Sequence, residues 1–391
     1  MAAALLPGNQ VTLLECGVQY FPALIAAIDA AQREVHLETY IYALDPTGEA
    51  VTLALTRAAA RGCAVRVLVD GFGGRDFADH TAPRLRAAGV EVLIYRQELR
   101  ALRIRRHRLR RLHRKLAVID ARVAFVGGIN VIDDYDTPGQ TPPRFDYAVR
   151  IEGPLLGPIH TSVRRVWWLV SWAGLRERPA WHSDVAPRPE PAGAVRAAFV
   201  IRNNLRNRRD IENAYLEAIG QARREIVIAN AYFLPGRRFR QALIEASRRG
   251  CNVVLLLQGR VEYLLMHYAT RALYPHLLAG GVRIFEYHRS FLHAKVAVCD
   301  GHWATVGSSN IDPFSLMLAR EANVVVRDVG FARELRDSLE HAMQHGAREL
   351  RLEDHRRAPW YRRFASWGAY MLVRAMMGIV GVRRLEPPHQ R

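Results

Sequence analysis

The sequence predicts an α/β protein built from two tandem copies of one unit, and two observations carry this prediction. Short β-branched runs alternate with Ala- and Arg-rich segments of helical character, a pattern typical of strands buried between helices. In addition, four stretches of one half of the 391-residue chain recur in the same order in the other half. They are QREVHLETYIY (32–42) with RREIVIANAYF (223–233), ARGCAVRVLVDG (60–71) with RRGCNVVLLLQG (248–259), LRAAGVEVLIYR (85–96) with LLAGGVRIFEYH (277–288), and LHRKLAVIDARVAFVGGIN (112–130) with LHAKVAVCDGHWATVGSSN (292–310).

The repeat also sets the expected domain organisation. The Pro-rich stretch at 178–193 reads as a linker between the two copies. We therefore expect a first domain over 1–177, the linker, a second domain over 194–350, and a basic amphipathic tail over 351–391. Half of the residues are hydrophobic, which suffices for two cores of ordinary size.

The fourth repeated stretch predicts a β-hairpin that carries chemistry. Residues i and i+2 of a strand face the same way, so His113 points with Lys115 and His293 points with Lys295. Asp120 and Asp300 follow each apolar run at the predicted turn, and Asp300-Gly301 is a strong hairpin signal. The returning strands end at Asn130 and Asn310. Each hairpin should therefore bring a His, a Lys and an Asn together at its open end.

The two aspartates should lie at the other end of each hairpin. Seven strand residues span roughly 23 Å at about 3.3 Å each, so neither Asp120 nor Asp300 can reach its own histidine. We expect both to fix the turn, although they belong to the repeated motif with the candidate catalytic residues.

The lysine content singles out the same motif. Of the 56 basic residues, 54 are Arg and only Lys115 and Lys295 are Lys. A compact ammonium differs from a planar guanidinium in the contacts it makes. A His, a Lys and an Asn supplied twice suit a phosphodiester. The Lys and Asn can hold its oxygens, one neutral His can attack phosphorus, and the other, protonated, can donate to the leaving alcohol. We expect no metal and no cofactor.

The formal net charge of +18 is concentrated in two places. Residues 96–115 carry +9 and residues 351–391 carry +6. Gly89 and His113 are 24 residues apart but Gly281 and His293 only 12, so the first basic run is an insertion directly before the motif. Such patches attract polyanions, either nucleic acid or an anionic membrane surface. Arg103, Arg105, Arg106 and Arg108 are the predicted membrane-binding residues of the insertion.

The tail contains a long apolar stretch over 364–382, interrupted by Arg374. We expect a helix lying in the membrane interface, with Trp367 toward the lipid and Arg374 outward; a helix packed on the core is the alternative. The N-terminus MAAALLPGNQ lacks the features of a signal peptide. The four scattered Cys suit a reducing cytosol.

The pattern HxKxxxxD, followed by GGIN or GSSN and present twice, resembles the phospholipase D superfamily. FDYAVRIEGP, ARREIVIANAYFLPG and HWATVGSSNIDPFSLMLAREANVVV resemble bacterial cardiolipin synthases of the type without N-terminal transmembrane helices, to about residue 350. This resemblance implies two mixed sheets flanked by helices and packed as one body about a pseudo-twofold axis. It implies a phosphatidyltransferase that converts two molecules of phosphatidylglycerol into cardiolipin and glycerol through a phosphohistidine. It also implies a peripheral protein on the cytoplasmic face of the inner membrane, with an anionic phospholipid as substrate.

The resemblance further assigns residue roles. Family members place a carboxylate about 30 residues after each His and bonded to that imidazole, which matches Asp146 and Glu321. His113 would be the nucleophile and His293 the acid, or the reverse. The second motif has Ser308 where the first has Gly128, so the halves should hold phosphate unequally, through Asn130, Asn310 and Ser308.

Other interpretations stay open. A phospholipase D-type hydrolase, or a nuclease drawn to DNA by the Arg run, would use the same motif. The run lacks the interleaved aromatic residues of single-strand binders, so no nucleic acid is expected. A non-enzymatic binder of anionic surfaces is disfavoured by the two intact motifs. Tyr40 and Glu38 could line the pocket or simply belong to a half-buried strand, GFGG (71–74) is read as a plain turn, and the oligomeric state is left open.

Overall fold

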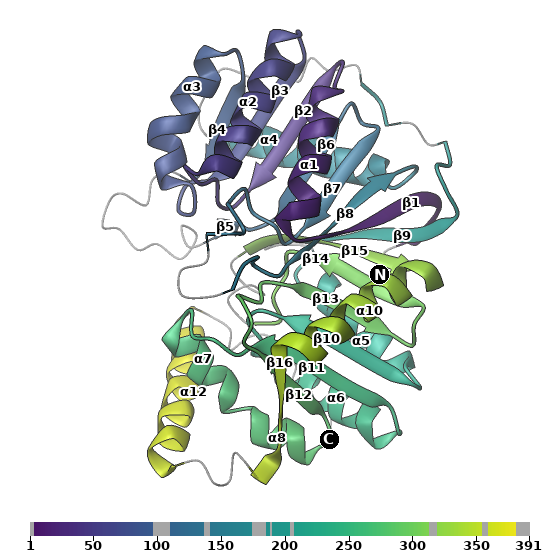
Figure 1. Ribbon diagram of the computed structural model, residues 1–391, viewed down its shortest axis with the longest axis vertical. Helices are drawn as coiled ribbons and strands as arrows, with labels where there is room; N and C mark the ends of the chain where they lie inside the picture. Colours follow the sequence, from purple (N-terminus) through teal and green to yellow (C-terminus); the bar gives the residue numbers. More distant parts are fainter. Residues whose placement is uncertain are drawn as a thin grey trace.

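A computed structural model describes residues 4–96, 110–136, 141–173, 185–187, 190–203, 207–312, 319–353 and 359–380. Within these ranges sixteen strands belong to one continuous sheet (Figure 1). Its main path runs β16-β12-β11-β10-β13-β14-β15-β9-β1-β8-β7-β6-β2-β3-β4, and β5 pairs with β15. The predicted α/β class is confirmed.

The first half alternates strands with helices as the repeat predicts. Its elements are β1 (Leu6–Glu15), α1 (Cys16–Asp29), β2 (Glu34–Thr39), α2 (Pro46–Ala60), β3 (Ala64–Asp70), a π-helical turn η1 (Phe77–Thr81), α3 (Ala82–Ala87), β4 (Glu91–Tyr95), β5 (Arg111–Leu112), β6 (Lys115–Ile119), β7 (Val123–Gly127), β8 (Tyr147–Glu152) and α4 (Leu156–Ala173).

The second half largely repeats this order and adds a short strand and a C-terminal helix. Its elements are β9 (Val195–Arg202), α5 (Asp210–Gln221), β10 (Glu225–Asn230), α6 (Arg237–Arg248), β11 (Asn252–Gln258), α7 (Leu264–Arg271), α8 (Tyr274–Ala279), β12 (Arg283–Tyr287), β13 (Lys295–Cys299), β14 (Trp303–Gly307), β15 (Ala319–Arg327), α10 (Val329–Gly346), β16 (Ala347–Leu350) and α12 (Trp360–Val380).

Each half is a mixed sheet. In the first, β2, β3 and β4 are parallel, because helical crossovers connect them, and β6, β7 and β8 are antiparallel hairpin strands. In the second, β10, β11 and β12 are parallel and β13, β14 and β15 antiparallel. The antiparallel pair β1–β9 joins the halves. A pseudo-twofold axis at that junction relates the strand order of one half to that of the other.

The sheet folds back at this junction, so that β7 and β8 of one half contact β14 and β15 of the other. The inner faces, together with α4 and α10, form a shared apolar core. The outer faces are covered by α1, α2 and α3 in one half and by α5, α6, α7 and α8 in the other. Strand β6 shows the alternation: Leu116 and Val118 enter the shared core, whereas Ala117 and Ile119 enter the outer one.

Helix α12 packs against α7 at one edge of the second half (Figure 1). Val373 is buried in the contact, whereas Phe364 and Trp367 are more than half exposed. No helix in the described ranges is both long and apolar enough to cross a membrane. Most of the predicted linker, and the basic insertion with Arg103, Arg105, Arg106 and Arg108, lie outside the described residues.

Candidate active site

The two hairpins deliver their His-x-Lys pairs to the junction between the halves. The segment before each histidine is held by the opposite half. The backbone N–H of His113 donates to the carbonyl of Arg320 (3.0 Å), and that of His293 donates to the carbonyl of Phe145 (2.8 Å). The two motifs therefore face one another, as the repeat leads one to expect.

The carboxylates pair with the histidines across the axis. His113 Nδ1 lies 3.0 and 3.2 Å from the two carboxylate oxygens of Glu321, and His293 Nδ1 lies 2.6 Å from Asp146 Oδ2. The expectation that each carboxylate binds the histidine of its own half is wrong. The reason is that β5, which leads into His113, pairs with β15, which carries Glu321. Both Nδ1 atoms are thereby engaged, which leaves Nε2 for the substrate.

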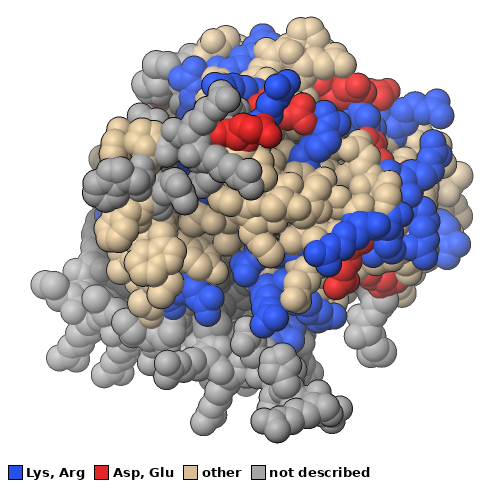
Figure 2. Space-filling model, turned by 90° about the horizontal axis from the view of Figure 1, so that it is seen from below, with Lys and Arg blue, Asp and Glu red and all other residues tan. Residues whose placement is uncertain are grey.

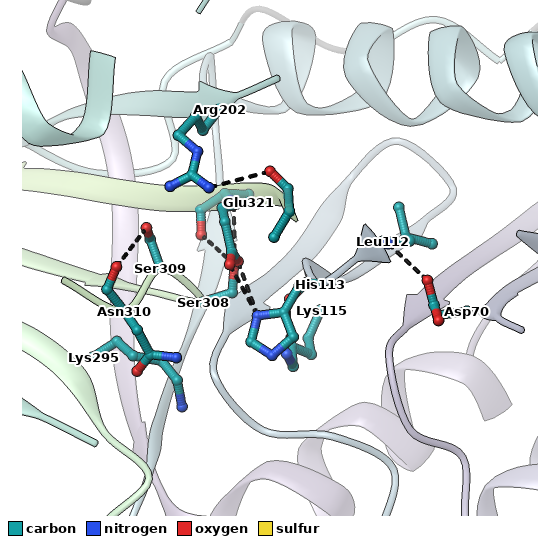
Figure 3. A network of polar contacts seen from close by, with 12 residues as sticks. Asp70, Leu112, His113, Lys115, Arg202, Lys295, Ser308, Ser309, Asn310 and Glu321 are labelled. Atoms are coloured by element: carbon teal, nitrogen blue, oxygen red, sulfur yellow. Dashed lines mark hydrogen bonds and ion pairs between the residues drawn. The ribbon is translucent and has the colours of Figure 1, made fainter. Parts of the chain in front are cut away.

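The residue beside each carboxylate differs between the halves. The hydroxyl of Ser308 donates to Glu321 Oε2 (2.5 Å) and accepts from the N–H of Ala322 (3.1 Å), as Figure 3 shows for Glu321. The sequence predicts that this hydroxyl binds phosphate, but the hydroxyl is buried and its hydrogen bonds go to the Glu321 carboxylate and to the backbone of Ala322. In the first half, a Cβ on Gly128 would lie 2.4 Å from Asp146 Oδ1. A glycine is needed there because Asp146 occupies the space that a side chain would take.

Both lysines are buried at the same place, with Lys115 2 % and Lys295 0 % exposed. Lys115 Nζ donates to the carbonyl of His113 (2.7 Å), and Lys295 Nζ lies 3.4 Å from Asp146 Oδ2. In Figure 3, His113, Lys115, Lys295 and Asn310 gather below Glu321. The four chain segments that carry these groups thus converge on one centre.

This centre is built to receive an anion. Burial lowers the pKa of Lys115 to about 7, and it lowers the pKa of Lys295 as well. Burial and the ammonium of Lys295 lower the pKa of His293 to about 3, and burial lowers the pKa of His113. Burial away from water thus disfavours the protonated, positively charged form of all four side chains. An anion bound between them would offset this free-energy cost.

Asp120 and Asp300 lie at the ends of their hairpins away from the histidines, as strand length predicts, so neither belongs to the catalytic centre although both belong to the repeated motif. Asp120 accepts from the backbone N–H groups of Gln32, Arg33 and Glu34 at 2.8 to 2.9 Å. Asp300 accepts in the same way from Arg223, Arg224 and Glu225. Both have φ of 50°. Each carboxylate fixes its turn and also fastens it to the start of the neighbouring strand.

The two asparagines are buried beside the motif. Asn130 Oδ1 accepts from the N–H of Ile41 (3.1 Å), whereas Asn310 Oδ1 has no partner among the described residues. Contact of their amide groups with phosphate stays a prediction. Tyr40 packs edge-on against His113, with ring centroids 4.9 Å apart, so it lines the site.

Several residues near the site were missed by sequence reasoning. Arg114, between His113 and Lys115, points to the opposite face, where its guanidinium forms an ion pair with the buried carboxylate of Glu38 and donates to Ser162 Oγ (2.8 Å). Glu38 is therefore not a pocket residue. The signal was present in the repeat, since Arg114 and Glu38 correspond to Ala294 and Ala229, and two linked departures from an apolar pattern indicate a pair.

Comparison with known proteins gives a consistent result. A family profile described as "Cardiolipin synthase, PLD-like domain" matches residues 24–135 and 215–343. Cardiolipin synthase B of Escherichia coli K12 is 39% identical over 400 residues, covering 98% of this chain and 94% of that protein. The major cardiolipin synthase ClsA of Bacillus subtilis is 30% identical over 84% of this chain and 67% of its own length.

Solved structures share the fold at low sequence identity. The phosphatidylserine synthase of Haemophilus influenzae aligns with a TM-score of 0.72 and 12% identity, over 97% of this chain and 96% of that chain. A polyphosphate kinase from Porphyromonas gingivalis aligns with a TM-score of 0.57 and 16% identity, over 95% of this chain and 53% of that one. At these identities the likeness shows the fold.

Proposed function

The chain belongs to the cardiolipin synthase family of phospholipase D-like proteins and is a phosphatidyltransferase, and from this premise we propose that it makes cardiolipin and glycerol from two molecules of phosphatidylglycerol. The observation that carries the proposal is the pair of buried His-Lys motifs that meet at the junction, each histidine bonded to a carboxylate of the other half. Two imidazoles and two ammonium groups around one centre are what in-line displacement at a phosphodiester requires.

The proposed reaction has two steps that share one centre. Nε2 of His113 attacks the phosphorus of the first phosphatidylglycerol, and the bond from phosphorus to the glycerol oxygen breaks. His293 donates the proton that glycerol needs to leave. His293 then takes a proton from the hydroxyl of a second phosphatidylglycerol, whose oxygen attacks phosphorus and releases His113. The products are cardiolipin, glycerol and the free enzyme.

The electrostatics of the site support an order of events. With the pKa of His293 at about 3, the imidazole is neutral before the lipid binds and cannot donate a proton. The positive charges of Lys115 and Lys295 disfavour protonation of the histidines. An anionic phosphodiester bound between the two lysines offsets those charges and raises the pKa of both histidines. Asp146 stays available as the partner of a charged His293. Burial alone would raise the pKa of Asp146, but the charges of Lys295 and His293 outweigh it and hold the pKa of the Asp146 carboxyl below its ordinary value.

We propose that the outward face of α12 attaches the enzyme to the membrane that contains its substrate. Its exposed side chains include Phe364, Trp367, Met371, Leu372 and Met376, between 40% and 64% exposed. Arg374 is exposed and its guanidinium lies over the ring of Tyr370, at 5.8 Å. Figure 2 views the molecule from below and shows several groups of Lys and Arg side chains on this end, with smaller groups of Asp and Glu among them. Exposed apolar side chains next to a cation suit the interface of an anionic bilayer, so we propose peripheral attachment to the cytoplasmic face of the inner membrane.

The direct test uses purified protein and vesicles of labelled phosphatidylglycerol. Cardiolipin and glycerol should appear in equal amounts. Phosphatidic acid in place of cardiolipin would indicate a hydrolase instead, and the absence of both lipid products would contradict the proposal. Degradation of plasmid DNA by the same preparation would favour a nuclease.

A further inference from the structure

A pocket of the second half lies next to the residues that flank His293. Its lining includes Tyr232, Gln258, Glu262, Tyr263, Met266 and Thr270. Two of its walls are bonded to the residues on either side of the histidine. Gln258 Oε1 accepts from the N–H of Leu292 (3.3 Å), and the N–H of Ala231 donates to the carbonyl of Ala294 (3.0 Å). The pocket and the imidazole are thus parts of one rigid arrangement.

The polar groups of this pocket suit hydroxyl groups. The phenol of Tyr232 donates to a carboxylate oxygen of Glu262. Gln258 Nε2 is buried and has no hydrogen-bond partner among the described residues. A carboxylate that accepts, an amide that donates and a phenol that can do both match the alternating donors and acceptors of a polyol. Glu262 also lies close enough to Lys295 to influence its charge.

The equivalent positions of the first half form a tight turn. Asp70 replaces Gln258 in the repeat, and its carboxylate accepts from the N–H groups of Leu112 (2.8 Å) and Phe72 (2.9 Å). The GFGG turn closes over Tyr40, since a Cβ on Gly73 would lie 2.4 Å from the carbonyl oxygen of Tyr40. Among the described residues, the first half thus has a tight turn at the positions that correspond to the pocket, so the two sides of the centre differ in structure.

A cation from the other half lies beside the pocket. The guanidinium of Arg144 lies 5.3 Å from the ring centre of Phe291, and its Nε is buried without a partner among the described residues. Arg144 influences the titration of His293, Tyr232 and Tyr263, which places its charge near all three. A guanidinium with an unused donor suits a phosphate oxygen.

We propose that this pocket is the alcohol site of the enzyme: it holds the glycerol headgroup, first as leaving group and then as attacking hydroxyl, and Arg144 contacts the phosphate of the accepting lipid. The inference rests on the proposed phosphatidyl transfer and deepens it. It also assigns the acid and base role to His293, because that imidazole is the one beside the alcohol, and leaves His113 as the nucleophile.

The test makes two acceptors compete for the same phosphatidyl group. Full-length wild-type protein, Glu262→Gln, Tyr232→Phe and the control Glu217→Gln on α5 are each given phosphatidylglycerol vesicles and ethanol. The ratio of cardiolipin to phosphatidylethanol is measured together with total glycerol release. Ethanol has no second hydroxyl for Glu262, so Glu262→Gln should lower the ratio about tenfold or more, because a hydrogen bond to a charged group is lost. Tyr232→Phe should lower it less, and Glu217→Gln should leave it unchanged.

The reverse reaction provides a second measurement. With cardiolipin and free glycerol as substrates, Glu262→Gln should raise the KM for glycerol about tenfold. A wild-type ratio and a wild-type KM for glycerol in Glu262→Gln would overturn the assignment while leaving phosphatidyl transfer intact. Failure of the wild-type protein to form either lipid product would instead contradict the transfer reaction itself, and the pocket assignment with it.

Discussion

The two halves place the same His-x-Lys motif but support it with different chemistry on the face that α4 or α10 covers. In the first half the inward side chains of β2, β3 and the segment before β6 include His36, Glu38, Arg66 and Arg114, all at most 3 % exposed. Their repeat partners are Val227, Ala229, Val254 and Ala294, which belong to the shared apolar core. The fold therefore does not require ions in this layer.

The two halves stabilise the same layer in different ways. Glu38 is bonded to both Arg114 and His36, and Arg114 also reaches Ser162 on α4. A buried ion pair of this kind adds little compared with apolar packing, but it is costly to leave one member alone. The second half shows the apolar solution to the same packing problem.

The largest expected effect separates the roles of the two histidines. His113→Ala should remove the covalent phosphatidyl-enzyme and lower turnover about a thousandfold or more, because the proposed nucleophile is lost. His293→Ala should also stop turnover but still form the covalent enzyme from a substrate with a good leaving group. Quenched reactions with labelled lipid, followed by detection of the label on protein, distinguish the two. Labelling of His113→Ala and not of His293→Ala would reverse the assignment.

The ion pair of the first half can be broken by one substitution and then replaced by the apolar residues that the second half has at these positions. Arg114→Ala should lower the free energy of unfolding by about 3–5 kcal/mol, because Glu38 is left as an unpaired buried charge. The double change Glu38→Ala with Arg114→Ala, which copies Ala229 and Ala294, should cost clearly less. Unfolding in urea measures both. If the double variant is less stable than Arg114→Ala, the comparison between the layers does not hold.

Substitutions of the residues beside the two carboxylates should have a smaller effect on activity, and the effect should differ between the halves. Ser308→Gly should lower kcat about tenfold, because Glu321 loses one hydrogen bond and with it part of its hold on His113. The converse change, Gly128→Ser, should be worse, since its Cβ would collide with Asp146. Steady-state kinetics with a pH profile check both. Equal effects of the two changes would mean that the halves support their carboxylates alike.

The smallest effect concerns pH. Burial lowers the pKa of His36 below its ordinary value. Its contribution to stability is complete above about pH 6.5 and is lost as the pH falls below that value, because the unfolded chain then binds a proton that the folded chain refuses. His36→Val, which copies Val227, should reduce the loss of stability between pH 7 and pH 5 by up to about 2 kcal/mol. Urea unfolding at the two pH values measures it, and an unchanged loss would show that His36 does not titrate on unfolding.

The sequence predicted the class of fold, the two repeated units and the convergence of His113, Lys115, His293 and Lys295, because all depend on local periodicity and on an order that recurs. It also predicted that Asp120 and Asp300 serve the turns, since strand length alone excludes contact with the histidines. The crossing of Asp146 and Glu321 could not be predicted, because it depends on how β5 pairs with β15 across the junction. Ser308 was misread for the same reason: its partner is a carboxylate brought in by that pairing.

The alcohol pocket and the charged layer were not found because each depends on which side chain faces which across two sheets. Glu262 and Arg144 lie more than a hundred residues apart in the chain. Neither belongs to a motif, and neither differs from an ordinary surface residue until the halves are assembled.

The crossed pairing of His113 with Glu321 has a consequence for biosynthesis. A polypeptide that is still emerging from the ribosome and ends before Lys295 contains the whole first motif, but His113 has neither the carboxylate of Glu321 nor the facing lysine. The first half cannot begin to attack membrane lipid while the second is unfinished. Synthesis must therefore proceed through Glu321 before the site can be assembled.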